Sequence, residues 1–443
     1  MTSPVPLTIR PGPPLTGETR VPGDKSITHR AVLIALLGPG RTVVRGANPG
    51  ADCAATLACG RALGLSVTED ADLLTLARDT LHAPGAVLDC GNSGSTLRML
   101  AGVLAGQPFE ATLDGDDSLR GRPVARIVGP LRAMGAAVRA RDGDRLPPLT
   151  VHGGALRPFR GRLEMASAQV ASAIEFAALA ASGESVIEVP GAARDHTERM
   201  LAATGIPIGV ESLAGGGRRV TVVGPASPGE RHFDVPGDFS SAAFLLATAA
   251  PRPGARVTVR GVGLNPTRTG LLDVIRAMGG EVRVTPRGDA GGEPVGDITI
   301  EGRDLAGFEV PAEWVPRLVD EVPAWAILAA QARGTSRLSG AAELRVKESD
   351  RLATLAAGLA RLGVPVEEKP DGLVITGALI GGGSVASAGD HRIAMAFAAL
   401  ATAAGKPVMV DDRRSIDTSY PGFETTLASL GARLGPEDER DPA

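Results

Sequence analysis

Seven residues near the N-terminus combine cationic and hydroxyl side chains at a predicted helix start. Residues 24–30 read DKSITHR; they follow a Val-Pro-Gly break and precede the apolar run 31–38, which predicts a buried helix. Lys25, Ser26 and Arg30 therefore lie at or just inside a helix N-terminus, where free backbone N–H groups and the helix dipole favour an anion by up to about 2 kcal/mol. The stretch predicts a binding site for a phosphate or carboxylate group, and a solvated basic helix cap is the alternative interpretation.

A second charged cluster, RVKESDRL at 345–352, combines cations with an acid. In a helix, Lys347 and Arg351 would share one face, where like charges cost about 0.2–0.5 kcal/mol. Glu348 could relieve this repulsion as a surface ion pair with Arg351. Alternatively, an external anion lies against both cations, and Glu348 is available for proton transfer. The residues alone leave both interpretations open.

Polar groups also stand at the other predicted helix starts. A glycine-rich turn that contains Gly94 could admit an anion to its backbone N–H groups, and an ordinary turn is the alternative. Ser167, Gln169 and Asp320 stand at or just before the starts of apolar helices, where helix capping is the alternative. Together these starts predict an electropositive cleft, with Asp320 and Glu348 as candidate acid–base groups. Its expected cations are Lys25, Arg30, Arg122, Arg194, Lys347, Arg351 and Arg392.

Lysine is scarce in this chain, which makes its positions informative. Of 46 basic residues only four are lysines: Lys25, Lys347, Lys369 and Lys406. A lysine ammonium can release a proton, whereas an arginine guanidinium cannot. Lys369 and Lys406 lie in turn-like sequence, so Lys25 and Lys347 are the candidates for work that an arginine could not do.

The composition argues against several classes of protein. A net charge of −4 and an aromatic content of 3% argue against nucleic-acid binding. No apolar run approaches the roughly 18 residues of a membrane span, and the N-terminus lacks the apolar core of a signal peptide. Cys53, Cys59 and Cys90 cannot all pair and form no CxxC motif. We therefore expect a cytoplasmic protein with no nucleic-acid or membrane partner.

A repeated structural unit must position these clusters. A pattern of an apolar residue or Thr, then Gly, two residues and an aliphatic residue recurs six times, at Gly64, Gly135, Gly205, Gly279, Gly363 and Gly431. It predicts a helix that ends at a left-handed glycine and is followed directly by a strand. Separations of 68 to 84 residues indicate two helices and several strands per unit. A stretch rich in Gly and Pro, 211–233, predicts a linker between two domains of three repeats.

Ten segments, in order over nearly the whole chain, resemble the 5-enolpyruvylshikimate-3-phosphate synthase family of enolpyruvyl transferases. They are GDKSITHR, GNSGSTLR, DGDDSLRGRP, SAQVASA, RDHTERM, GDFSSAAF, LNPTRTG, DEVP, RVKESDRL and GDHRIAM. The resemblance implies an α/β fold: a two-domain inside-out α/β barrel with six βαβαββ repeats, three per domain, and an active site in the interdomain cleft. It implies that domain one comprises 1–20 plus 236–443 and that domain two comprises 21–235.

The resemblance also implies a reaction and its substrates. The enolpyruvyl group of phosphoenolpyruvate would pass to the 5-hydroxyl of shikimate-3-phosphate, with release of phosphate and with no metal or organic cofactor. The sequence has no Walker A loop, HExxH motif or clustered cysteine ligands, which agrees with that implication. The implied shikimate-3-phosphate site comprises Lys25, Ser26, Arg30, Ser167, Ala168, Gln169, Arg194, Asp320 and Lys347. The implied phosphoenolpyruvate site comprises Lys25, Gly94, Arg122, Gln169, Arg351 and Arg392.

For the chemistry, an addition followed by an elimination, we hypothesise that Asp320 is the base toward the hydroxyl. Lys25 and Glu348 would shuttle the proton at C3 of the donor, and exchanging their two roles is equally compatible with the sequence. We also expect a monomer and binding of glyphosate, because Gly94 leaves the donor pocket without an extra methyl group. Three positions depart from the pattern of part of the family: Ala168 replaces a serine, Glu343 an asparagine and Thr418 a lysine.

Two other interpretations predict different functions. A UDP-N-acetylglucosamine enolpyruvyl transferase would share fold and donor, but that family carries a cysteine on a loop matching 114–122, and this chain has none there. A noncatalytic repeat protein such as a ring clamp needs a broad basic lumen, which the net charge of −4 argues against.

Overall fold

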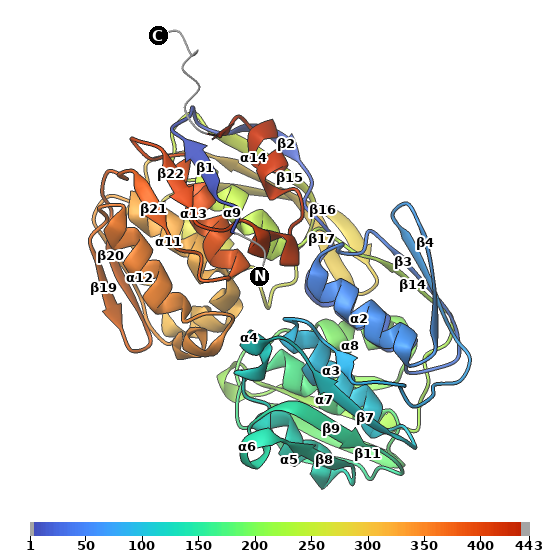
Figure 1. Cartoon of the computed structure of the whole chain (residues 1–443). Coiled ribbons are helices and arrows are strands. Elements are labelled where there is room, and N and C mark those ends of the chain that lie inside the picture. Colours follow the sequence, from blue (N-terminus) through green and yellow to red (C-terminus); the bar gives the residue numbers. More distant parts are fainter. Residues whose placement is uncertain (1–3, 436–443) are drawn as a thin grey trace. The chain divides into compact units, whose positions relative to one another are not determined.

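The computed structural model describes residues 4–435, which divide into two compact units (Figure 1). Unit 1 comprises 4–22, 237–288 and 294–435, and unit 2 comprises 23–236 and 289–293. The stretch 289–293 thus belongs to unit 2, whereas the sequence analysis assigned it to the domain formed by the second half. No helix within the described chain has the length and apolar character needed to cross a membrane.

Unit 2 contains three small mixed sheets among its described residues. Their strand orders are β14-β3-β5-β4, β6-β7-β9-β8 and β10-β11-β13-β12. In each sheet the first two strands named are parallel and the remaining pairs are antiparallel. The strands are β3 Gly40–Arg45, β4 Leu65–Asp70, β5 Leu73–Arg78, β6 Leu88–Asp89, β7 Glu110–Asp114, β8 Ala137–Ala140, β9 Leu146–His152, β10 Arg160–Arg162, β11 Gly183–Val189, β12 Ile208–Ser212, β13 Arg218–Gly224 and β14 Arg231–Asp234.

Unit 1 also contains three sheets within residues 4–435, in the orders β21-β22-β1-β23, β16-β17-β15-β2 and β18-β20-β19. Strand β1 (Leu7–Arg10) pairs with both β22 and β23, so the N-terminal strand lies beside strands from the end of the chain (Figure 1). The other strands are β2 Thr16–Thr19, β15 Arg256–Gly263, β16 Glu281–Ala290, β17 Glu293–Glu301, β18 Thr335–Leu338, β19 Val366–Lys369, β20 Gly372–Thr376, β21 Gly383–Val385, β22 Val408–Val410 and β23 Arg433–Leu434.

Three helices in each unit bury nine or more of their residues. They are α1 Lys25–Ala35, α3 Gly94–Ala105 and α7 Ala168–Ala178 in unit 2, and α9 Phe239–Ala249, α11 Val322–Gln331 and α13 His391–Ala401 in unit 1. A helix that is apolar on all sides is stable only inside a core, which is why residues 31–35 of the apolar run are buried in α1. These helices pass through the two hydrophobic cores and bring their N-terminal residues to the polar clusters described below.

Six further helices end at the repeat glycines. They are α2 Ala51–Ala62, α5 Ala125–Ala133, α8 His196–Ala203, α10 Gly270–Ala277, α12 Arg351–Arg361 and α14 Phe423–Ser429, and each ends two residues before such a glycine. The six glycines have φ between +80° and +107°, and a strand follows each within four residues. The predicted helix ends are therefore confirmed, and the count of βαβαββ repeats stays a prediction. The remaining short helices are α4 Asp117–Arg120, α6 Arg141–Asp144, η1 Ala214–Gly216, η2 Ala312–Arg317, η3 Val319–Glu321, η4 Ala342–Val346 and η5 Arg414–Thr418.

Candidate active site

Side chains cap the three buried helices of unit 2. Asp24, Ser93 and Ser167 accept hydrogen bonds from the backbone N–H three residues later, at 3.0, 3.1 and 3.5 Å. Each cap satisfies one of the free N–H groups of a helix start and fixes where the helix begins. Lys25 and Ser26 are consequently the first two residues of α1, as the sequence analysis predicted.

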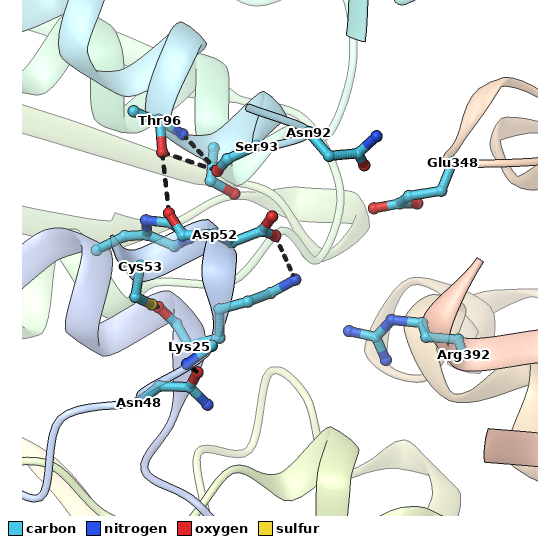
Figure 2. A network of polar contacts seen from close by, with 12 residues as sticks. Lys25, Asn48, Asp52, Cys53, Asn92, Ser93, Thr96, Glu348 and Arg392 are labelled. Carbon is cyan, nitrogen blue, oxygen red and sulfur yellow. Dashed lines mark hydrogen bonds and ion pairs between the residues drawn. The ribbon is translucent and has the colours of Figure 1, made fainter. Parts of the chain in front are cut away.

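The ammonium group of Lys25 is held by a carboxylate that the sequence analysis missed. Its Nζ lies 2.8 Å from Oδ2 of Asp52, and both side chains are largely buried, at 13% and 9% exposed (Figure 2). The backbone carbonyl of Asp52 also accepts a bond from the Thr96 hydroxyl at 3.5 Å, which ties α2 to the start of α3. The available signal for Asp52 was an acid in the first turn of a predicted helix, which is a common capping pattern and carries no partner information.

Arg30 lies inside α1 and is nearly fully buried. Its three side-chain nitrogens donate to the hydroxyl of Thr197 at 2.7 Å, to the hydroxyl of Ser172 at 2.9 Å and to the carbonyl of Ser26 at 2.9 Å. Burial lowers the pKa of the Arg30 guanidinium from its ordinary value. The structure thus brings Arg30 to the helix start as a support for the backbone of Ser26 rather than as an open cation.

Two arginines face the start of α3, where Gly94 is the first helical residue. Arg122 donates to the carbonyl of Asn92 at 3.1 Å, to its side-chain oxygen at 2.5 Å and to the hydroxyl of Ser118 at 3.0 Å. A Cβ atom at Gly94 would lie 2.7 Å from Nη1 of Arg98 and 3.7 Å from Nη1 of Arg122. The glycine therefore lets both guanidinium groups approach the helix start closely.

Gln169 links the starts of α3 and α7. Its Nε2 donates to the hydroxyl of Ser95 at 2.9 Å, and its Oε1 accepts from Nη1 of Arg98 at 2.8 Å. Arg98 also donates to the carbonyl of Pro123 at 3.1 Å. Ala168, the first residue of α7, precedes this contact and contributes only a methyl group. Arg98 was not predicted, although a single cation inside the apolar run TLRMLAGVLA was a usable signal.

Arg194 lies just before α8 and is partly exposed. The guanidinium of Arg218 holds the loop that carries Arg194, because it donates to the backbone carbonyls of Ala193 at 2.6 Å and Arg194 at 2.9 Å. Arg218 also forms a buried ion pair with Glu198. A cation buried beneath the loop thus fixes the backbone at Arg194.

In unit 1, the second charged cluster is not one helix, so the condition under which Lys347 and Arg351 would share a helical face is not met. The 3-10 turn η4 ends at Val346, and α12 begins at Arg351. Asp350 caps α12 by accepting a backbone N–H bond at 3.0 Å. A capping aspartate sets the helix start at the next residue, which leaves residues 347–350 outside any helix.

Arg351 is surrounded by three carboxylates. Its guanidinium lies 2.7 Å from Glu348, 2.8 Å from Asp390 and 3.6 Å from Asp320, and its side chain is 1% exposed. Burial by itself would lower the pKa of Arg351, but the charges of Asp390 and Glu348 outweigh burial and raise it. The ion pair with Glu348 therefore exists, but Arg351 is buried and is not a surface cation.

Lys347 and Arg392 complete the cluster around Asp320. Lys347 Nζ lies 3.8 Å from Oδ1 of Asp320 and forms a second ion pair with Glu343. Arg392, in the first turn of α13, donates from Nη1 to the backbone carbonyl of Asp320 at 2.8 Å, and the same nitrogen lies 3.8 Å from Glu321. Its Nε and Nη2 make no hydrogen bond or ion pair with any other described residue. Arg392 thus has two side-chain nitrogens, Nε and Nη2, that can donate to a bound anion.

The structure brings the predicted residues together within each unit. Lys25, Ser26, Gly94, Arg122 and Gln169 gather at the starts of α1, α3 and α7 in unit 2. Asp320, Lys347, Glu348, Arg351 and Arg392 form one cluster in unit 1. Between residues 4 and 435, no group of three or more His, Cys, Asp or Glu side chains is arranged to hold a metal ion.

Comparison with known proteins identifies the family. Residues 9–427 match the EPSP synthase (3-phosphoshikimate 1-carboxyvinyltransferase) family. The chain is 49% identical over 421 residues to the 3-phosphoshikimate 1-carboxyvinyltransferase of Anaeromyxobacter sp. strain K, with 94% of each chain covered. It is 45% identical over 434 residues to that of Alkalilimnicola ehrlichii, with 96% of each covered.

Solved structures agree with this match. An EPSP synthase from Acinetobacter baumannii superposes with a TM-score of 0.85 at 39% identity, covering 97% of this chain and all of the other. The enolpyruvyl transferase NikO from Streptomyces tendae shares the fold at 17% identity, with a TM-score of 0.77 over 98% and 99% of the two chains. The predicted α/β two-domain fold and the predicted transfer of an enolpyruvyl group to shikimate-3-phosphate in the shikimate pathway are confirmed. The chain belongs to the EPSP synthase (3-phosphoshikimate 1-carboxyvinyltransferase) family.

Proposed function

We propose that the polar clusters of both units act on the same two substrates, shikimate-3-phosphate and phosphoenolpyruvate. Each cluster combines cations with helix starts, which suits the phosphates of both substrates and the carboxylates. For the acceptor we assign Lys25, Ser26, Arg30, Ser167, Ala168, Gln169, Arg194, Asp320 and Lys347. For the donor we assign Lys25, Gly94, Arg122, Gln169, Arg351 and Arg392. Arg30 acts through the backbone of Ser26 in this assignment.

The surroundings of Asp320 carry the proposal for the chemistry. Its carboxylate lies 3.8 Å from Lys347 and 3.6 Å from Arg351, and its backbone carbonyl accepts a bond from Arg392. One short turn therefore holds a candidate base next to a cation with open donors. A hydroxyl bound beside Asp320 can transfer its proton to the carboxylate while the donor is held by Arg392.

Arg351 and Arg392 play different parts in this proposal. Arg392 offers Nε and Nη2 to an anion directly, whereas Arg351 already faces three carboxylates, and in this proposal the donor takes the place of Glu348. A charge-assisted hydrogen bond contributes about 1.5–3 kcal/mol whichever oxygen accepts it, so this exchange is nearly balanced. Binding of the donor then releases the carboxyl group of Glu348 for proton transfer.

The reaction proceeds in two stages. In the addition, the 5-hydroxyl oxygen of the acceptor bonds to C2 of phosphoenolpyruvate, Asp320 takes the hydroxyl proton, and Lys25 or Glu348 protonates C3. In the elimination, the same group removes a proton from C3, the bond between C2 and the phosphate oxygen breaks, Asp320 returns its proton to the departing phosphate, and the enol ether forms. Both assignments of the C3 proton, to Lys25 and to Glu348, remain compatible with the arrangement.

The same chemistry extends to an inhibitor. Glyphosate carries a phosphonate and a carboxylate, the two anionic groups that we assign the donor site to bind. Gly94 adds no side chain to that site, and we propose that glyphosate competes with phosphoenolpyruvate there. We further propose a monomeric, cytoplasmic enzyme; the three cysteines are free and buried, as in a reducing compartment.

Release of phosphate with two acceptors tests the proposed function. The purified protein is incubated with phosphoenolpyruvate and either shikimate-3-phosphate or UDP-N-acetylglucosamine, and inorganic phosphate is measured. We expect release with shikimate-3-phosphate alone. Release with the nucleotide sugar and none with shikimate-3-phosphate would overturn the assignment.

A further inference from the structure

A buried chain of polar groups lies behind Asp320 and Arg392 in unit 1. Its central member is Glu321, which follows Asp320 in the turn η3 and whose side chain is 0% exposed. A fully buried carboxylate costs more free energy than an apolar side chain of the same volume would, unless other groups compensate its charge. The packing of this turn alone does not explain an acid here.

One side of Glu321 is held by residues from α9 and from the loop before α10. The hydroxyl of Ser240 donates to Oε1 of Glu321. Arg268 donates from Nη2 to the same hydroxyl at 2.8 Å and to Oδ1 of Asp238 at 3.0 Å. Ser240 therefore links the buried guanidinium of Arg268 to the carboxylate of Glu321 through two successive hydrogen bonds.

The other side of Glu321 faces Arg392. Oε1 of Glu321 lies 3.8 Å from Nη1 of Arg392, the nitrogen that also donates to the carbonyl of Asp320. Residues 320 and 321 thus restrain a single nitrogen of the guanidinium, one through the backbone and the other through a charge. With Nη1 restrained, Nε and Nη2 keep a fixed direction, and these are the donors without a described partner.

We propose that Glu321 is a positioning residue for the donor site. Its carboxylate, anchored by Ser240 and Arg268, fixes the guanidinium of Arg392 in the direction that a bound anion requires. Glu321 itself touches neither substrate and acts through Arg392. This inference rests on the proposed role of Arg392 in binding phosphoenolpyruvate.

Steady-state kinetics of the full chain test the proposal, with each substrate varied separately. Glu321→Gln keeps the shape of the side chain and removes its charge. We expect the KM for phosphoenolpyruvate to rise about tenfold, which corresponds to about 1.4 kcal/mol, and the KM for shikimate-3-phosphate to change less than twofold. Equal increases in both KM values would overturn the proposal, because a general loosening of the fold affects both substrates.

A double-mutant cycle separates this proposal from the one on which it rests. Arg392→Gln should raise the KM for phosphoenolpyruvate, and adding Glu321→Gln to it should change that KM less than twofold further. Multiplying effects would show that Glu321 does not act through Arg392 and would overturn the inference. An unchanged KM in Arg392→Gln would instead refute the proposed role of Arg392 itself.

Two further variants guard against misfolding. Ser240→Ala keeps the Glu321 charge but removes its anchor, and we expect about a threefold rise in the KM for phosphoenolpyruvate alone; no rise would count against the chain of contacts.

Asp297→Asn is the matched control, because Asp297 is another largely buried carboxylate of unit 1, held by Arg287 at 2.6 Å and by Arg260 at 3.4 Å. It should lower the thermal midpoint without changing either KM, and a change confined to phosphoenolpyruvate would overturn the assignment.

Discussion

A buried glutamate in unit 2 should make the stability of the enzyme fall as pH rises. Glu175 lies in the middle of α7 and is 0% exposed. Burial raises the pKa of its carboxyl group well above the ordinary range, and the negative charge of Glu198 on α8 raises it further. Arg218 from β13 and Arg30 from α1 oppose this effect without cancelling it. Glu175 is therefore protonated in the folded protein at pH values where it is ionised in the unfolded chain.

The sign and size of the effect follow from this difference. Below the unfolded pKa of about 4.3 both states carry the proton, and Glu175 contributes no pH dependence. Between that value and the raised folded pKa, the folded state binds more protons, so the free energy of unfolding falls by about 1.4 kcal/mol per pH unit. Between pH 5 and pH 7 this amounts to at most about 2.7 kcal/mol.

Glu175→Gln removes the titration while keeping a neutral side chain of the same size. Scanning calorimetry of both proteins from pH 5 to pH 7 should show that the midpoint of the variant rises relative to that of the natural protein as the pH increases. For a unit of 150–250 residues, about 2–4 °C per kcal/mol converts this upper limit into a relative gain of at most roughly 5–11 °C. A constant offset between the two proteins does not matter, because only its change with pH is predicted.

A glutamate on the surface of the same unit provides the control. Glu184 on β11 has a side chain that is 49% exposed, so Glu184→Gln should give a midpoint curve parallel to that of the natural protein. Parallel curves for Glu175→Gln as well would refute the reasoning, since they would mean that Glu175 has the same pKa in the folded and unfolded states.

Three further changes should affect the site. Gly94→Ala places a methyl group 2.7 Å from Nη1 of Arg98 and should break the hydrogen bond from that guanidinium to Gln169. Loss of this bond costs about 1.5–3 kcal/mol, which corresponds to roughly a 10- to 100-fold rise in the KM for phosphoenolpyruvate. An unchanged KM would contradict this prediction. Lys25→Arg keeps the charge, but an arginine cannot donate a proton, so kcat should fall about 10²–10⁴-fold while the affinity for shikimate-3-phosphate changes far less. Equal losses in the affinity measured by calorimetry and in kcat would exclude a proton-transfer role. Asp390→Asn removes a buried carboxylate partner of Arg351 and should lower the free energy of unfolding by about 3–5 kcal/mol, measured by thermal or denaturant unfolding. A loss below about 1 kcal/mol would argue that the Arg351–Asp390 ion pair contributes little to stability.

Local patterns in the sequence predicted the elements and the positions of the functional side chains along them. The helix start at Lys25 follows from the capping residue Asp24 and the apolar run after it. The six repeat glycines mark helix ends because the chain leaves each helix through a residue with positive φ, which glycine adopts readily. The start of α12 is also readable from the sequence, because Asp350 precedes the apolar periodicity and caps the helix.

Contacts between distant segments could not be predicted in this way. Asp52 is 27 residues from Lys25, and Ser240 is 81 residues from Glu321. No local periodicity records such pairings, since they depend on how helices from different repeats pack. The resemblance to the family implied the residues that we assign to the substrates, but it implied none of these partners. The supports of the site had to come from the three-dimensional arrangement.

These supports explain why two arginines assigned to one substrate differ so much. Arg351 forms ion pairs with three carboxylates, Asp320, Glu348 and Asp390, whereas Arg392 is held at one nitrogen only. In the proposed assignment, an incoming anion meets Arg392 first and then takes the place of a protein carboxylate at Arg351. If that carboxylate is Glu348, the acid becomes available when the donor is already in place, which would prevent proton transfer before the substrates are bound. The order of events is then built into the charges that surround each cation.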